Sequence, residues 1–176
     1  ATIFSGQLFR FHTTDASTII GVQGNNVILL EQRPNAIHAS TSHTAPKNYL
    51  RTFFYLDTVD LPVLADAWCD VPLFADAWKN QPGIRITKQD PHECIFAFLC
   101  ASAAPISRIS QMLNTLSKHH GTHITDDLYA FPTIEQLLDV TDAQLRSYSF
   151  GFRAPRIIAA ARFFHANDIT PDALAA

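Results

Sequence analysis

The chain has 176 residues, of which 47% are hydrophobic and 16% are charged. This apolar content can bury a sizeable core in one domain or two small lobes, which argues against disorder. The longest apolar runs are far shorter than the roughly 18 residues of a membrane helix. Residues 1–4 also lack the basic and apolar regions of a secretion signal, so we expect an intracellular protein.

The three cysteines, Cys69, Cys94 and Cys100, are odd in number and lack the short paired spacings that bind zinc. This pattern argues against a disulfide scaffold and against a zinc module. We therefore expect buried thiols and no metal site.

The formal net charge of -3 hides an uneven distribution along the chain. Residues 1–78 carry four basic and seven acidic groups, whereas residues 79–118 carry five basic and two acidic groups. Residues 141–165 carry four arginines against one aspartate. Two segments at +3 are compatible with a local anion-binding face, although any one of these residues can equally be a solvated surface charge.

The first forty residues favour strands. Residues 17–22 and 26–30 are β-branched or apolar runs, and the turn-forming pair Gly24-Asn25 lies between them. Residues 7–12 alternate polar and apolar side chains, and residues 35–39 can add a further strand. The sequence thus predicts a small antiparallel sheet.

From residue 45 onward the apolar side chains take a helical spacing. Proline in a first turn and capping residues indicate several helix starts. The predicted helices cover residues 49–56, a segment starting at 60–62, then 91–99, 107–118, 133–138, 142–148 and 153–164, with one more starting at 170–172. Trp68 and Trp78 lie in two Ala-Asp-Ala-Trp segments, and we expect both to pack beneath the sheet.

No self-contained active site is visible in the sequence. His119, His120 and His123 flank a glycine at a predicted helix end and lack a carboxylate or thiolate at metal-ligand spacing. They are therefore interpreted as helix-terminal histidines. The sequence also lacks a Gly-x-Ser-x-Gly nucleophile elbow and a phosphate-binding glycine loop.

Three segments stand out by their order and separation: Ser5-Gly6-Gln7-Leu8-Phe9-Arg10, the run from Pro82 to Cys94, and the run from Phe150 to Arg156. Together they resemble the 8-oxoguanine DNA glycosylases of the helix-hairpin-helix superfamily. The resemblance implies an α+β fold, with a TATA-binding-protein-like antiparallel sheet lobe followed by an all-helical glycosylase lobe that is incomplete in this chain. It places the sheet lobe and its covering helices at residues 1–79 and the partial helical lobe at residues 80–176.

The resemblance also implies roles for four residues. Gly6 matches the glycine whose carbonyl accepts the N7 hydrogen of flipped 8-oxoguanine, a hydrogen that guanine lacks. Arg108 and Arg153 match the arginines that hold the orphaned cytosine, and Phe152 matches the aromatic wedge in the vacated stack. Taken alone, each also fits an ordinary role: a strand-end turn, a surface charge or a core aromatic.

Two departures from the family pattern stand out. Where the family often has asparagines, one of which contacts the cytosine, this chain has Ala103-Ala104-Pro105, whose side chains cannot hydrogen-bond. We therefore do not assign to this chain the family's strict preference for cytosine opposite the lesion. The family's hairpin, nucleophilic lysine and aspartate correspond to positions beyond Ala176, and none of the chain's lysines lies in a Gly/Pro-rich hairpin that could replace them.

We therefore expect a lesion-recognition portion of an 8-oxoguanine DNA glycosylase/lyase, inactive alone and without catalytic residues, metal or organic cofactor of its own. Its expected partners are damaged double-stranded DNA and the C-terminal portion of the same enzyme, with no membrane. The compartment would be cytoplasmic in a bacterium and nuclear in a eukaryote. Two alternatives remain: a non-catalytic DNA-binding or interaction module, and a glycosylase for alkylated bases.

Overall fold

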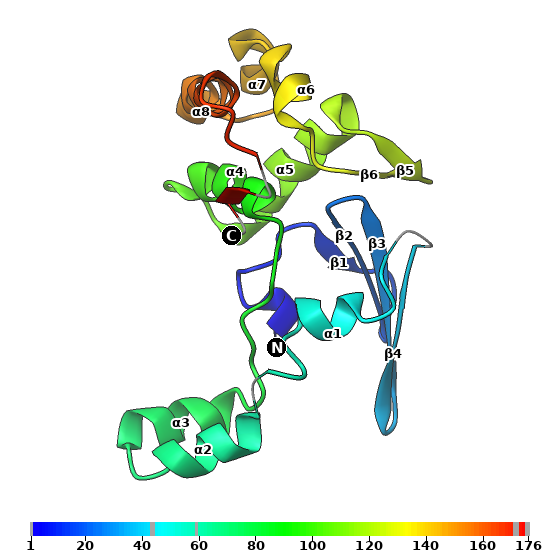
Figure 1. Ribbon diagram of the computed structural model, residues 1–176, viewed down its shortest axis with the longest axis vertical. Coiled ribbons are helices and arrows are strands. Elements are labelled where there is room, and N and C mark those ends of the chain that lie inside the picture. The colour runs from blue at the N-terminus through cyan, green and yellow to red at the C-terminus, as the bar shows by residue number, and fades with distance from the viewer. Residues whose placement is uncertain (1, 43–44, 59, 171–172, 175–176) are drawn as a thin grey trace. The chain divides into compact units, whose positions relative to one another are not determined.

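A computed structural model of the protein describes residues 2–42, 45–58, 60–170 and 173–174. It consists of a four-stranded antiparallel sheet, in the order β1-β2-β3-β4, followed by helices (Figure 1). The strands are β1 (Phe11–Thr13), β2 (Thr18–Gln23), β3 (Asn26–Arg33) and β4 (Ala36–Thr41). The predicted α+β class is confirmed.

The β2–β3 hairpin sets the register of the sheet. Gln23 pairs with Asn26, which leaves Gly24 and Asn25 as a two-residue turn. Gly24 has a φ of +55°, a left-handed conformation that glycine adopts without steric cost. The predicted hairpin is therefore confirmed, and so is the strand predicted at residues 35–39.

The strand predicted at residues 7–12 is only partly right, because β1 begins at Phe11. Two polar side chains of this segment, both before β1, have partners outside the sheet. Gln7 hydrogen-bonds the backbone at Arg85, and Arg10 enters a buried ion pair with Glu93. The alternation of polar and apolar residues therefore reflects these long-range contacts, and residues 7–10 do not form part of the predicted strand.

Most of the predicted helices are confirmed. The helical elements of the described residues are the 3-10 turns η1 (Thr2–Phe4) and η2 (Gly151–Arg153), and the helices α1 (Tyr49–Phe53), α2 (Leu61–Trp68), α3 (Pro72–Asn80), α4 (Pro91–Ala101), α5 (Ile106–His120), α6 (Ile134–Leu138), α7 (Asp142–Ser147) and α8 (Ala154–Ala166). The sequence pattern did not predict η1, η2 or a separate α3. Asp60 and Asp90 cap α2 and α4, and Thr133 and Thr141 form capping boxes on α6 and α7. The helix start predicted at residues 170–172 lies partly outside the described residues.

The sequence pattern did not predict a second, short hairpin. It pairs β5 (His123–Thr125) with β6 (Leu128–Tyr129) after α5 ends at Gly121. Two residues or three are too few for strand periodicity to show.

The main core lies among α4 to α8. Ile109, Met112, Leu113 and Leu116 form the predicted buried face of α5, and each is at most 4% exposed. They pack with Phe96 and with buried residues of α6, α7 and α8. This packing fixes the start of α8 and the η2 turn that precedes it.

The chain divides into two compact units. Unit 1 comprises residues 1–8 and 45–88, and unit 2 comprises residues 9–44 and 89–176. Unit 1 therefore holds η1 and α1 to α3, while unit 2 holds the sheet and α4 to α8. The boundary between lobes expected at residues 79 and 80 falls inside unit 1, and that division stays a prediction.

Two expectations about single side chains are wrong. Trp68 is 52% exposed, so it is not a core residue, and Cys69 is an exposed thiol. Cys100 is buried as expected, and burial raises its pKa to about 12. No helix in the described part of the chain is long and apolar enough to cross a membrane.

We expect substitution of Gly121 by alanine to destabilise the fold strongly. A Cβ atom there would lie 1.9 Å from the Ala130 carbonyl oxygen and 2.7 Å from that of Ser117. Because both obstacles are backbone atoms, Gly121→Ala should lower the free energy of unfolding by about 3 kcal/mol or more. Gly24→Ala meets open space and only a positive φ, so it should cost about 1 kcal/mol.

Urea unfolding of the two variants against the wild type measures both values. An equal or smaller loss for Gly121→Ala than for Gly24→Ala would contradict this packing.

Candidate nucleic-acid interface

Two arginines tie together the loop between α4 and α5 and the turn that precedes α8. Arg108, at the start of α5, donates from Nη2 to the Ser149 carbonyl at 3.4 Å. Arg153, in η2, donates from Nη2 to the Ser102 carbonyl. Each guanidinium thus comes from one segment and bonds the backbone of the other, so the two segments hold each other in place.

The Phe152 ring contacts two guanidinium groups. The guanidinium carbon of Arg153 is 4.4 Å from the ring centroid, and that of Arg156 is 5.6 Å away. The ring is nevertheless 54% exposed, whereas Arg153 is only 7% exposed. Such cation–π contacts hold the ring without covering it. The arrangement presents an apolar face beside positive charge, which suits a stacked base next to a phosphate.

The backbone of both tied segments is strained. Ala103 has a φ of +50° and Ser149 a φ of +73°. Residues other than glycine rarely adopt this region of backbone conformation. Residues in such backbone conformations persist only where surrounding contacts hold them, and they cluster at functional sites. Here the two arginine hydrogen bonds hold the backbone, one at Ser102 beside Ala103 and the other at Ser149 itself.

Gly6 lies in unit 1, in a turn, with a φ of +89°. Its neighbour Gln7 fixes this turn through its side-chain amide. Gln7 Nε2 donates to the Arg85 carbonyl at 2.8 Å, and the Thr87 amide nitrogen donates to Gln7 Oε1 at 3.0 Å. The first two conspicuous sequence segments are thereby joined. Sequence reasoning had singled out Gly6 and assigned no role to Gln7, whose only signal was its place directly after the glycine.

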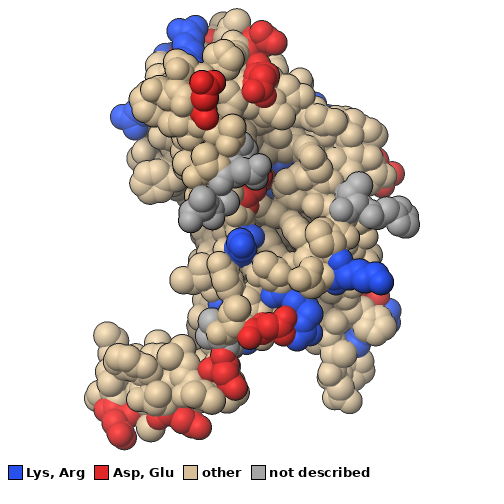
Figure 2. Space-filling model, viewed as in Figure 1, with Lys and Arg blue, Asp and Glu red and all other residues tan. Residues whose placement is uncertain are grey.

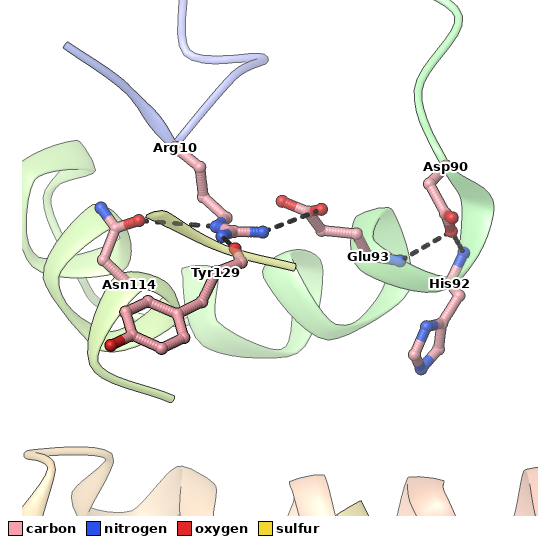
Figure 3. A network of polar contacts seen from close by, with 6 residues as sticks. All are labelled: Arg10, Asp90, His92, Glu93, Asn114 and Tyr129. Carbon is pink, nitrogen blue, oxygen red and sulfur yellow. Dashed lines mark hydrogen bonds and ion pairs between the residues drawn. The ribbon is translucent and has the colours of Figure 1, made fainter. Parts of the chain in front are cut away.

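Arg10 forms a buried polar network in unit 2 (Figure 3). It is 5% exposed and donates to Glu93 Oε2 and Asn114 Oδ1, both at 3.4 Å, and to the Tyr129 carbonyl. These partners belong to α4, α5 and β6. The residue before β1 is therefore joined to three elements that follow the sheet, and periodicity gave no signal for it.

Burial governs the electrostatics of the pair formed by Arg10 and Glu93. Burial raises the pKa of Glu93 to about 7, against the opposing effect of Arg10. Burial likewise lowers the pKa of Arg10, which the negative charge of Glu93 partly offsets. The neighbouring Asp90 carboxylate accepts the amide hydrogens of His92 and Glu93 and so caps α4.

Two histidines at the end of α5 contact an aromatic side chain. The structure's described residues include no group of three or more His, Cys, Asp or Glu that could hold a metal ion. His119 instead stacks on Tyr148 with ring centroids 4.6 Å apart, and His120 Nε2 lies 3.3 Å from the Tyr148 hydroxyl. Lys118 pairs with Asp127 at 2.7 Å, which raises the lysine pKa and keeps it protonated.

The four residues singled out in the sequence thus fall into two groups. Arg108, Phe152 and Arg153 are brought together in unit 2, and Gly6 lies in unit 1. An antiparallel sheet, a helical core and an exposed aromatic ring flanked by arginines define an α+β protein with a cationic, aromatic surface segment.

The family follows from the sequence comparison. The family model of the 8-oxoguanine DNA glycosylase N-terminal domain matches residues 1–95, more than half of the chain. The chain belongs to the 8-oxoguanine DNA glycosylase family.

Two of the curated relatives are similar to this chain in sequence. The N-glycosylase/DNA lyase OGG1 of Arabidopsis thaliana is 31% identical over 170 residues, which cover 89% of this chain and 45% of that protein. The N-glycosylase/DNA lyase of Saccharomyces cerevisiae is 38% identical over 123 residues, which cover 67% of this chain and 32% of that protein. The chain therefore spans less than half the length of either relative.

Solved structures share the fold. The 8-oxoguanine glycosylase/lyase of Clostridium acetobutylicum, in complex with double-stranded DNA containing cytosine opposite 8-oxoguanine, superposes with a TM-score of 0.86 at 22% identity. That match covers 97% of this chain and 60% of the other. MBOgg1 in complex with a low-affinity DNA ligand gives a TM-score of 0.85 at 24% identity, covering 96% and 60%.

We expect Arg10→Met to destabilise the protein in a pH-dependent way. It leaves Glu93 buried without its partner, which costs about 3–5 kcal/mol when the carboxylate is charged. Because burial raises the Glu93 pKa to about 7, the native state binds a proton more readily than the unfolded chain does. Stability should therefore fall as pH rises from about 4.5 to 7, and the Arg10→Met loss should be larger at pH 8 than at pH 5.

Urea unfolding at the two pH values tests this expectation. Arg51→Met is the matched control, because it removes an exposed ion pair with Asp57 and should change stability little. An Arg10→Met loss that is equal at both pH values would show that Glu93 does not titrate in this window.

Proposed function

We propose that this chain is the lesion-recognition portion of an 8-oxoguanine DNA glycosylase/lyase that acts on damaged double-stranded DNA. The observation that carries the proposal is the exposed Phe152 ring in contact with the guanidinium groups of Arg153 and Arg156. The reported names of the relatives from A. thaliana and S. cerevisiae, both N-glycosylase/DNA lyase, support the same activity.

In this proposal Phe152 takes the place of a base that has left the DNA stack. Flipping a base out of a duplex costs a few kcal/mol of stacking and pairing. An aromatic ring inserted in the gap recovers about 1–3 kcal/mol of stacking. Phe152 suits this role because it is held by neighbouring arginines and still exposes about half of its surface.

Arg108 and Arg153 are proposed to hold the cytosine left behind. A guanidinium carries five N–H donors. Arg108 uses two of them, toward the Ser149 carbonyl and Gln111 Oε1, and Arg153 uses one toward the Ser102 carbonyl, so each arginine keeps further donors for the cytosine acceptors. Ala103, at the left-handed position of the neighbouring loop, has no side-chain hydrogen-bonding group to add. We therefore propose that the preference for an opposite cytosine rests on the arginines and is less strict than in members with an asparagine there.

Gly6 is proposed to read the lesion itself. A backbone carbonyl attracts the N7 hydrogen of 8-oxoguanine and repels the bare N7 acceptor of guanine. The positive φ of Gly6 and the bonds of Gln7 to the Arg85–Thr87 backbone support a carbonyl held in one orientation. Preorganisation of this kind is what discrimination by one hydrogen bond requires.

The chemistry is proposed to come from the part of the enzyme that this chain does not span. A lysine nucleophile must lose its proton near neutral pH, and Lys118 is held protonated by Asp127. The intact enzyme would use a lysine Schiff base and β-elimination, with no metal or organic cofactor. It would act in the compartment that holds DNA: the cytoplasm of a bacterium or the nucleus of a eukaryote.

We expect the chain to bind a duplex with one 8-oxoguanine:cytosine pair more tightly than the undamaged duplex, with affinity that falls as salt rises. Phe152→Ala should weaken lesion binding about 10-fold because it removes the stacking contribution. Fluorescence anisotropy measures both effects. Phe163→Ala is the matched control, because this α8 ring is 59% exposed and should contribute nothing.

The same titrations separate the alternatives. Equal affinity for damaged and undamaged duplexes would favour a non-catalytic DNA-binding module. Preference for a duplex with an alkylated base, unchanged by Phe152→Ala, would favour an alkylated-base glycosylase.

The product of the complete gene tests the proposed chemistry. We expect a mass well above the 19.6 kDa of this chain and a covalent adduct with 8-oxoguanine:cytosine DNA after borohydride reduction. If the product of the complete gene has a mass of 19.6 kDa and traps no DNA, the protein is a non-catalytic binding module and the proposed enzyme activity is wrong.

A further inference from the structure

The helical hairpin of α2 and α3 exposes large apolar side chains. Val63 is 62% exposed, Trp68 is 52% exposed and Leu73 is 82% exposed. Leu64 and Val71 are also exposed, at 39% and 41%. Exposed large apolar side chains in such number over twenty residues are typical of a surface that binds another molecule.

The two helices pack on each other and leave these side chains outside. Phe74 and Trp78 stack with ring centroids 6.1 Å apart on α3, and both are half-buried. Leu64 and Trp68 are four residues apart and therefore share one face of α2. The exposed apolar surface thus includes a helix face as well as the α2–α3 turn, where Val71 lies.

The same hairpin is acidic. Asp60, Asp66, Asp70 and Asp76 are all exposed. Lys79, in the last turn of α3, is the one lysine or arginine from residue 52 to residue 80. Figure 2 shows acidic side chains distributed over the hairpin. Apolar side chains among four carboxylates and a single lysine form a surface that is complementary to a basic and apolar partner.

We propose that the α2–α3 hairpin is a docking surface for a basic amphipathic helix of a partner protein. Apolar residues of that helix would cover Trp68 and Leu73, and its lysines or arginines would face the aspartates. DNA does not fit this surface because its phosphates would meet carboxylates. A second copy of the chain does not fit either, because each copy would bring the same four aspartates.

Charge and exposure on unit 1 carry this inference, so it does not depend on the proposed DNA-binding role of Arg108, Phe152 and Arg153 in unit 2. The two surfaces are chemically opposite. The arginines beside Phe152 would attract phosphate, whereas the aspartates of the hairpin would repel it. A basic protein partner would therefore bind the hairpin and not the arginine segment.

Intrinsic fluorescence can report on the hairpin alone, because the chain's two tryptophans, Trp68 and Trp78, both lie in it. The probe is a synthetic leucine/lysine amphipathic peptide of about 18 residues, or roughly five helical turns. We expect a saturable blue shift on its addition, because Trp68 leaves water. A leucine/glutamate peptide of the same pattern should give none, and about 1 M salt should weaken the binding at least 10-fold.

Variants locate the binding site. The double substitution Val63→Ser and Leu73→Ser should weaken peptide binding at least 10-fold, and so should Asp66→Asn with Asp70→Asn. Ile37→Ser is the matched control, since Ile37 is 62% exposed on β4 and should leave binding unchanged. All these side chains are exposed, and circular dichroism of each variant verifies the fold.

Four results would overturn the proposal. The first is equal binding of both peptides, and the second is binding that the hairpin variants leave unchanged. The third is a dimer of the chain in sedimentation that Val63→Ser and Leu73→Ser dissociate, which would assign the surface to self-association. Weakened lesion binding in the hairpin variants would instead show that the surface belongs to the DNA site.

Discussion

A buried arginine is the constraint on which unit 2 depends. Arg10 has lost almost all contact with water, so each of its donors needs an acceptor in the protein. Glu93, Asn114 and the Tyr129 carbonyl supply these acceptors from α4, α5 and β6 (Figure 3). The residue directly before β1 is thereby hydrogen-bonded to three elements that follow the sheet in sequence.

The same physical device recurs at the proposed DNA-binding segment, with a different consequence. Arg108 and Arg153 each bond one backbone carbonyl of the opposite segment, so strained residues such as Ala103 and Ser149 are held while Phe152 stays exposed. Arg10 bonds an acceptor from each of its three guanidinium nitrogens. Arg153 is almost as buried, at 7% exposure, but its Nε has no hydrogen-bond partner among the described residues.

Local signals in the sequence predicted much of the fold. Asp90 followed by proline, the Gly24-Asn25 turn and the apolar face of α5 each act within a few residues, and the structure confirms them. The contacts that were missed join distant residues: Gln7 with Arg85, and Arg10 with Glu93. Trp68 was expected in a core because it is a large apolar residue. The sequence does not show whether another element covers such a residue, and in the structure it is 52% exposed. For the site, the resemblance supplied four residues, and their roles stay predictions.

The most direct test of the account is whether the chain unstacks DNA through Phe152. The base analogue 2-aminopurine, placed beside 8-oxoguanine in a duplex, emits weakly while stacked and strongly when the stack opens. At saturating protein, the account predicts a marked rise in emission with the wild type and little rise with Phe152→Ala. Saturated binding without any rise, or an equal rise with Phe152→Ala, would contradict the assignment of this ring as the wedge.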